Sequence, residues 1–166
     1  YAVSAPTTAT LRETGIAFST FRIRGTDGTS VTVEGEYAAS DLSLAVGIER
    51  LPIAALGLTP HITGSLIGEI TVTGEPTEPN ATIALESRGL RLYDRPGSVR
   101  FAAVQTDGFV DIDSATIDIG EVLTGEASGR LPLSVGTEGV HLRSLTDATL
   151  SASLESRRFA SFFVDD

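Results

Sequence analysis

Apolar and polar residues alternate along most of the chain, and this period of two constrains the fold more than any other feature. Val31–Glu34, Ile70–Thr73 and Thr116–Ile119 each place apolar side chains on one side and polar side chains on the other. Because successive side chains of a strand point to opposite faces, each segment is predicted to be a half-buried strand. Turn sequences such as Asp107-Gly108 and Asp94 to Gly97 separate them. Together they predict an all-β fold, either an antiparallel meander or a β-solenoid.

Two segments depart from the alternation and are predicted to be short amphipathic helices. Leu51 to Leu56 has apolar residues at helical spacing, with a proline near the expected helix start. Arg157 to Val164 shows the same spacing, with phenylalanine as the apolar residue. Each segment follows an alternating strand that ends in glutamate, Leu44–Glu49 in one case and Leu150–Glu155 in the other.

This similarity suggests an internal repeat of long period. A repeated strand-helix unit is typical of an elongated array whose neighbouring units complete one another's core. We therefore interpret residues 1–166 as a single fragment of a longer β-repeat protein, with residues 30–58 and 120–164 as repeated strand-helix units.

The charge balance argues against nucleic-acid binding. The net charge is −10, and all 12 basic residues are arginines. A protein that binds the phosphate backbone needs clustered basic residues, whereas this composition is typical of a solvated outer face. The chain has no cysteine, which excludes disulfides and thiolate metal sites. No apolar run approaches the ~18 residues that would span a bilayer.

Candidate catalytic residues are few. His61 and His141 lack partners at ligand spacing, so neither is predicted to hold a metal. Asp111 and Asp113 share a strand face, but no glycine-rich calcium loop surrounds them, and a hydrated surface explains them. Neither a nucleophile elbow nor a phosphate-binding loop occurs. The sequence therefore predicts no catalytic residue, no metal site, no cofactor and no enzyme activity.

The central part of the chain resembles a known family. Residues 51–85 read as a short helix, a Gly-x-Leu-x-Gly strand, an alternating strand that ends in Thr-Gly, a proline-containing turn and another strand. The matching residues are Gly64, Leu66, Gly68, Gly74, Pro79 and Leu85. This pattern resembles the repeated unit of the TamB family, the translocation and assembly module proteins related to AsmA. Residues 125–133 and the final strand-helix are similar to segments of the same family.

The resemblance implies a fold, a place and a role. TamB-like proteins are long periplasmic proteins, anchored in the inner membrane, that reach toward the outer one. The implied fold is a curled, groove-bearing repeat sheet, a β-taco, with an apolar interior. The implied function is phospholipid transport between the membranes and support of outer-membrane biogenesis. Phospholipid acyl chains would be the ligand, and an outer-membrane barrel protein of the translocation module would be a partner.

The apolar face of each strand supplies the residues expected to face lipid. These candidates are Val31, Val33, Leu44, Val46, Ile48, Ile70, Val72, Ile83, Leu85, Leu90, Leu92, Ile117, Ile119, Leu150 and Leu154. Acyl chains that cover such a face gain about 25 cal/mol per Å² of apolar area removed from water. The same side chains could instead pack against one another in a closed sandwich.

Three other functions stay open at this level. Open strand edges could accept strands of an outer-membrane protein by β-augmentation, which would make the chain an assembly scaffold. A β-solenoid adhesin segment would show a closed, packed interior. An enzyme built on a β-solenoid, such as a polysaccharide lyase, would need an acid–base cluster that the sequence does not show.

Overall fold

A computed structural model of the chain describes residues 2–3, 8–57, 61–120, 122–136, 139–142 and 147–156. The strands are β1 (Ala2–Val3), β2 (Ala9–Arg12), β3 (Gly15–Arg24), β4 (Ser30–Ala38), β5 (Leu42–Pro52), β6 (Ile62–Glu75), β7 (Glu78–Leu92), β8 (Arg95–Thr106), β9 (Phe109–Ile119), β10 (Leu123–Leu131), β11 (Leu133–Gly136), β12 (Gly139–Leu142) and β13 (Thr149–Ser156). The only helical element in these ranges is a single 3-10 turn, η1 (Ile53–Leu56).

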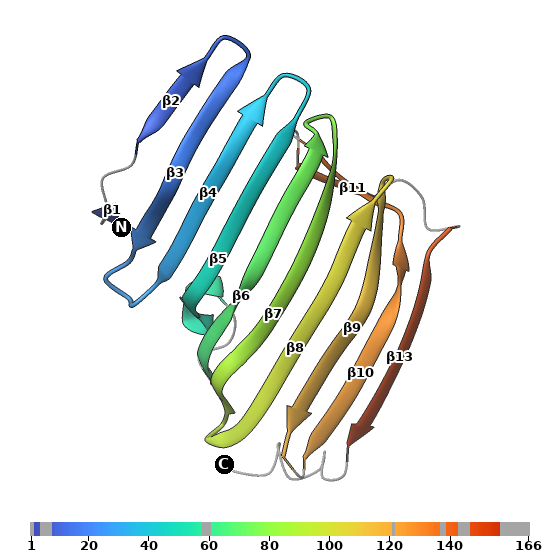
Figure 1. Ribbon diagram of the computed structural model, residues 1–166. Helices are drawn as coiled ribbons and strands as arrows, with labels where there is room; N and C mark the ends of the chain where they lie inside the picture. Colours follow the sequence, from blue (N-terminus) through green and yellow to red (C-terminus); the bar gives the residue numbers. More distant parts are fainter. Residues whose placement is uncertain are drawn as a thin grey trace.

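Eleven of the strands form one antiparallel sheet (Figure 1). Its order is β1-β3-β4-β5-β6-β7-β8-β9-β10-β13, with β2 paired to β3. β11 and β12 form a separate two-stranded hairpin. From β3 to β10 each strand pairs with the next along the chain, so the predicted antiparallel meander is confirmed. The β-solenoid is wrong, because successive strands reverse direction rather than coil in one sense.

The sheet is open, which corrects the prediction of a curled, groove-bearing β-taco. It is neither closed nor strongly curled, and its two edges lie at opposite ends of the strand order. Alternation fixes which side chains share a face, but it does not fix how far the sheet bends. Two of the chain's own segments, η1 and β11, lie behind the sheet in Figure 1. They cover parts of one face of the sheet. In a curled sheet, that face would instead be enclosed by the sheet's own curvature.

The first predicted helix is wrong in length and in type. Strand pairing continues to the end of β5, where Leu51 pairs with Leu66 and Pro52 with Ser65. Pro52 has the extended backbone angles φ −56° and ψ 131°. Only the four residues of η1 are left for helical structure, and Gly57 ends the turn with a left-handed φ of 66°. The second predicted helix, residues 157–164, lies outside the described residues.

The two strands on which the repeat was inferred are both present. Leu44–Glu49 lies within β5, in the interior of the sheet, and Leu150–Glu155 lies within β13, at its edge. The repeated units 30–58 and 120–164 stay a prediction, because the second unit lies partly outside the described residues.

Two of the hairpin turns have positive φ at both loop residues, as a two-residue type I′ turn requires. Asp107 and Gly108, with φ of 52° and 73°, form the predicted turn between β8 and β9. Between β7 and β8 the turn residues are instead Tyr93 and Asp94, with φ of 46° and 65°. The predicted turn residues at 96 and 97 lie within β8. The proline there pairs with Arg91 in the ladder.

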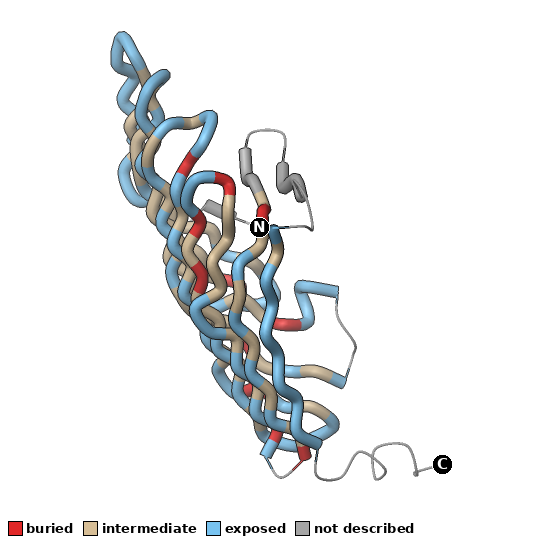
Figure 2. Tube along the Cα trace, turned by 90° about the vertical axis from the view of Figure 1, so that its right-hand side faces the viewer, coloured by how far each residue is buried: buried red, intermediate tan, exposed pale blue. Residues whose placement is uncertain are grey.

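The sheet is one layer thick, as the edge-on view in Figure 2 shows. Few apolar side chains are therefore buried: within the described ranges, the buried hydrophobic core comprises Ile53, Leu90, Ala103, Ile119 and Val122. Most alternating residues are half-buried on one side of a strand and exposed on the other, as the burial pattern of β6 shows. Stability therefore depends more on hydrogen-bonded pairing between strands than on a closed core.

Glycines on the half-buried side lie opposite leucines of the next strand. Gly35 pairs with Leu44, Gly68 with Leu85 and Gly129 with Leu150. A Cβ at Gly68 would overlap the carbonyl oxygen of Ala84 and lie 2.9 Å from a Leu85 methyl. The positive φ of Gly68, 153°, is also one that side chains rarely adopt. At Gly35 and Gly68 the missing side chain leaves room for a methyl group of Leu44 and of Leu85, each 2.9 Å from where a Cβ would lie.

Substitution of Gly68 by alanine is expected to lower the free energy of unfolding by roughly 3 kcal/mol, the upper end for a strained residue. Gly57→Ala is the matched control, because Gly57 also has positive φ but a Cβ there meets nothing within 4 Å. It should cost only about 1 kcal/mol. Urea denaturation of both variants measures the difference, and equal losses would contradict the close packing at Gly68.

Candidate functional site

The register of the sheet places the predicted lipid-facing residues on one face. Directly paired residues of an antiparallel sheet project to the same side. One continuous row of such pairs runs across the sheet from β4 to β13: Val33, Val46, Ile70, Ile83, Ala103, Ile112, Gly129 and Leu150. A second row joins Val31, Ile48, Gly68, Leu85 and Phe101.

All of the predicted residues share this side, which we call the apolar face. Besides the residues of these rows, the predicted set comprises Leu44, Val72, Leu90, Leu92, Ile117, Ile119 and Leu154. The sequence alternation therefore identified one surface, although register shifts interrupt several of the strand pairs. Whether these side chains contact lipid stays a prediction.

One end of the apolar face is covered by η1. Ile53 of η1 is buried in one cluster with Leu90, Ile119 and Val122. Leu90 and Ile119 are only 5% and 2% exposed, and Leu92 and Ile117 pack against the same cluster. These four predicted residues form a small core, which leaves them little surface for a ligand.

Another part of the apolar face is covered by the segment that leads into β11, which contacts β7 and β9. Pro132 is fully buried there, and Ala103 and Gln105 are also buried. The amide Nε2 of Gln105 donates a hydrogen bond to the carbonyl oxygen of Pro79, 3.1 Å away. This bond satisfies a polar side chain that the register places on the apolar face.

Between these two covered parts the apolar face is open to varying degrees. Val46, Ile70, Val72 and Leu85 are half-buried. At the β13 edge, Leu150 is 62% exposed and Leu154 66% exposed. The row of apolar side chains is therefore partly exposed from Val33 to Ile83 and again at Leu150, but it is interrupted at Ala103, which is only 1% exposed. Exposed apolar patches commonly mark interaction surfaces.

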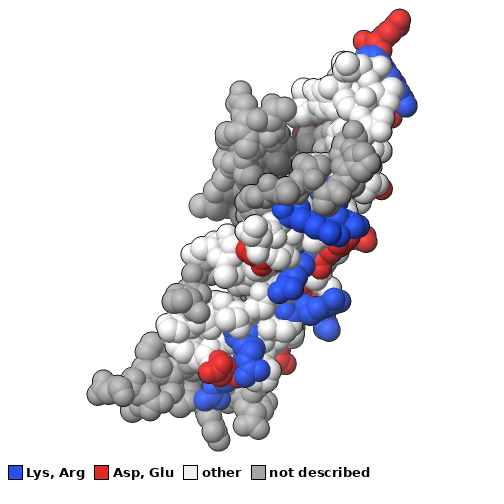
Figure 3. All heavy atoms as spheres, turned by 90° about the vertical axis from the view of Figure 1, so that its left-hand side faces the viewer, with Lys and Arg blue, Asp and Glu red and all other residues white. Residues whose placement is uncertain are grey.

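The opposite side of the sheet, which we call the charged face, carries exposed pairs of polar and charged side chains. The Arg22 guanidinium lies 2.7 Å from the Glu49 carboxylate, to which the Ser30 hydroxyl also donates a hydrogen bond. Figure 3, viewed from the β2 edge, shows charged side chains gathered mainly along one side of the molecule. Exposed pairs of this kind contribute about 1 kcal/mol or less each, so they orient side chains more than they stabilise the sheet.

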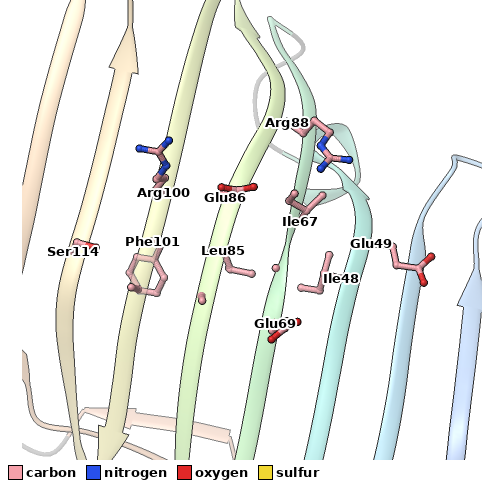
Figure 4. A pocket seen from close by; sticks show the side chains of 13 residues that line it. Ile48, Glu49, Ile67, Glu69, Leu85, Glu86, Arg88, Arg100, Phe101 and Ser114 are labelled. Atoms are coloured by element: carbon pink, nitrogen blue, oxygen red, sulfur yellow. The ribbon is translucent and has the colours of Figure 1, made fainter.

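A depression of about 700 Å³ lies on the charged face, and the sequence alone did not reveal it (Figure 4). Its floor is one row of small side chains, in which Ala84 pairs with Ala102 and Ala102 with Ser114. Longer side chains such as Arg88 and Arg100 line it as well. The small residues are visible in the sequence, but only the register shows that they adjoin.

The residues considered for chemistry have structural surroundings. Asp111 forms an ion pair with Arg130 at 3.7 Å, and the Arg130 guanidinium lies over the Phe109 ring. The His61 ring stacks on Tyr93 with centroids 4.3 Å apart. Among the described residues, no group of three or more His, Cys, Asp or Glu could hold a metal ion.

One carboxyl group has a perturbed acidity, and it lies in a turn. The backbone N–H of Thr29 donates a hydrogen bond to Asp27 Oδ1 at 3.0 Å, and this bond lowers the pKa of the fully exposed Asp27. The bond closes the turn between β3 and β4, so the shift reflects turn geometry rather than a reactive site.

The fold and this site define an open, single-layer antiparallel β-sheet with one apolar and one charged face. No protein-family model, curated protein or solved structure matches the chain. Within the described residues, no helix is both long enough and apolar enough to cross a membrane.

Two leucines of the apolar face test which part of it is packed. Leu90→Ala should lower the free energy of unfolding by about 3 kcal/mol, because Leu90 is buried under η1. Leu150→Ala should cost less than about 1 kcal/mol, because its side chain is mostly in water already. Urea denaturation measures both, and a large loss for Leu150→Ala would mean that this end of the face is covered in solution.

Proposed function

We propose that the chain is a segment of a TamB-like periplasmic protein whose apolar face carries phospholipid acyl chains between the inner and outer membranes. The row of paired apolar side chains from Val33 to Leu150 is the observation that carries this proposal. It is partly exposed from Val33 on β4 to Ile83 on β7, which offers a surface for an acyl chain, and it is covered at Ala103, which is 1% exposed.

The physical argument rests on apolar area. Half-buried side chains such as Ile70 and Val72 still contact water in the free protein. An acyl chain laid over them removes apolar surface from water on both partners, which gains about 0.8 kcal/mol for each methylene buried. Hydrophobic contact has no preferred direction, so a chain can shift from one row to the next without breaking specific bonds. An open face is sufficient for this role, and no curled sheet is required.

The glycines that carry the family resemblance have a structural role that fits this surface. Gly68 of the Gly-x-Leu-x-Gly motif pairs with Leu85, and the absence of a side chain at Gly68 leaves room for a Leu85 methyl group close to the backbone. A leucine held close to the backbone keeps the surface shallow there, which suits acyl chains of varied shape better than a pocket fitted to one ligand.

The proposal includes no catalytic step, metal or cofactor. The parent protein would be anchored in the inner membrane by a segment outside this fragment. At its other end, the parent protein would contact an outer-membrane barrel protein of the translocation module.

Aspartate placed on the apolar face should abolish lipid capture. Val72→Asp and Leu85→Asp each put a charge beside the acyl chains. Lipid binding would then bury an unpaired carboxylate, which is costly, so the lipid should dissociate. The matched controls are Thr71→Asp and Ala84→Asp, which stand next in the same strands but point to the charged face. Native mass spectrometry with lipid extraction should find phospholipid on the wild-type chain and on both control variants. It should find none on the two apolar-face variants.

Two results would count against this function. A wild-type chain that takes up no phospholipid from vesicles, while its sheet stays folded by circular dichroism, would refute the apolar face as a carrier. Equal lipid loss in the variants of both faces would show that the added charge acts through stability, not through contact with the ligand.

A further inference from the structure

We propose that phospholipid acyl chains cross the sheet at one place, over Phe101 of β8, in the gap between the two covers of the apolar face. This inference rests on the proposed function and adds the path that a bound chain takes. The row from Val33 to Leu150 does not supply this path, because it is covered at Ala103 of β8, which is only 1% exposed. The second row crosses the same strand at Phe101, which is half-buried.

On the apolar face, β8 is covered on both sides of Phe101. η1 lies near one end of the strands and β11 near the other (Figure 1). Val99 packs against the cluster under η1, whereas Ala103 and Gln105 are buried where the segment that leads into β11 covers the sheet. Of the apolar-face residues from Val99 to Gln105, Phe101 alone is neither buried nor packed against that cluster. Phe101 therefore marks the gap between the covers.

The second row continues across the sheet beyond Phe101. Phe101 pairs with Ala115 of β9, and Ala115 pairs with Ala127 of β10. Directly paired residues project to the same side, so both alanines belong to the apolar face. Both are half-buried, and their side chains are short. A chain that passes Phe101 therefore meets further apolar surface on the next two strands.

The width of the gap suits a single hydrocarbon chain. Val99 and Ala103 lie about 13 Å apart along β8, because they are separated by four residues at ~3.3 Å each. The covers themselves occupy part of this distance. A hydrocarbon chain in van der Waals contact needs about 4 Å to the atoms on each side of it. One acyl chain therefore fills the gap, with the Phe101 ring beneath it.

The chemistry of the row favours an acyl chain over a peptide. The side chains of Leu85, Phe101, Ala115 and Ala127 offer no hydrogen-bond donor or acceptor. A peptide laid across them would bury backbone N–H and C=O groups without partners, which is costly. A hydrocarbon chain has no such groups. The charged headgroup of the same phospholipid would stay outside the gap, in water.

Tryptophan probes test the path, because the chain contains no tryptophan. Phe101→Trp places an indole ring in the gap, and Ile70→Trp places one on the uncovered part of the apolar face. Ile112→Trp is the matched control, because Ile112 pairs with the covered Ala103 and β11 contacts its strand. Each variant is incubated with vesicles of phosphatidylcholine brominated on its acyl chains, which quench an indole on contact, and is then separated from them. Phe101→Trp and Ile70→Trp should lose most of their fluorescence, and Ile112→Trp should keep most of it.

The outcomes separate the path from the proposed function. Quenching of Ile70→Trp without quenching of Phe101→Trp would mean that lipid binds but does not cross β8, which overturns the path alone. Quenching of Ile112→Trp as strong as that of Phe101→Trp would place acyl chains over the covered row, and would also overturn it. No quenching in any of the three variants, with the sheet retained by circular dichroism, would count against lipid binding itself and the path with it.

A charge in the gap tests the same point without tryptophan. In Phe101→Asp a crossing chain would bury an unpaired carboxylate, so the affinity for phosphatidylcholine should fall roughly tenfold or more. Ala102→Asp is the control, because the next residue of β8 points to the charged face, and it should keep the wild-type affinity. Circular dichroism of both variants checks that the sheet is retained. Equal losses in the two variants, or no loss in Phe101→Asp, would contradict a crossing at Phe101.

Discussion

The hydrogen-bonded ladder between neighbouring strands is the interaction on which the rest of this structure depends. In most small proteins a closed core holds two layers together, but here one layer carries nearly all of the fold. Packing contributes mainly near η1, where Ile53, Leu90 and Ile119 meet, and at the entry to β11 near Ala103. Elsewhere the strands are held by backbone bonds and cross-strand side-chain pairs, so one face can stay apolar without being sealed.

The sequence predicted which segments are strands and which residues share a face, because only a β-strand places alternate side chains on opposite sides. It placed Val33, Ile70 and Leu150 on one surface, although these residues are far apart in the chain. Curvature was not predictable, because the same alternation suits a flat sheet and a curled one. The helix at residues 51–56 failed for a related reason: strand pairing at Leu51 and Pro52 is non-local, and it outweighed a local helical spacing.

The site was predicted in part and for identifiable reasons. Leu90 and Ile119 were correctly placed on the apolar face, but nothing local to them shows that η1 would cover them. The depression on the charged face depends on Ala84 and Ala102 lying side by side, which is a property of register. Register in turn is set by turns and bulges, and at the β7–β8 turn the loop residues are Tyr93 and Asp94 rather than the proline and glycine that follow.

The meander connectivity has a consequence for how such a chain can change in length. Each strand from β3 to β9 contacts chiefly the strands just before and after it in sequence. Gain or loss of a whole hairpin brings the chain back to the same end of the strands and the same strand direction, whereas a single added strand would reverse the direction of every strand that follows. Insertion or deletion of a hairpin can therefore lengthen or shorten this surface in steps of two strands, while the direction of the other strands stays the same.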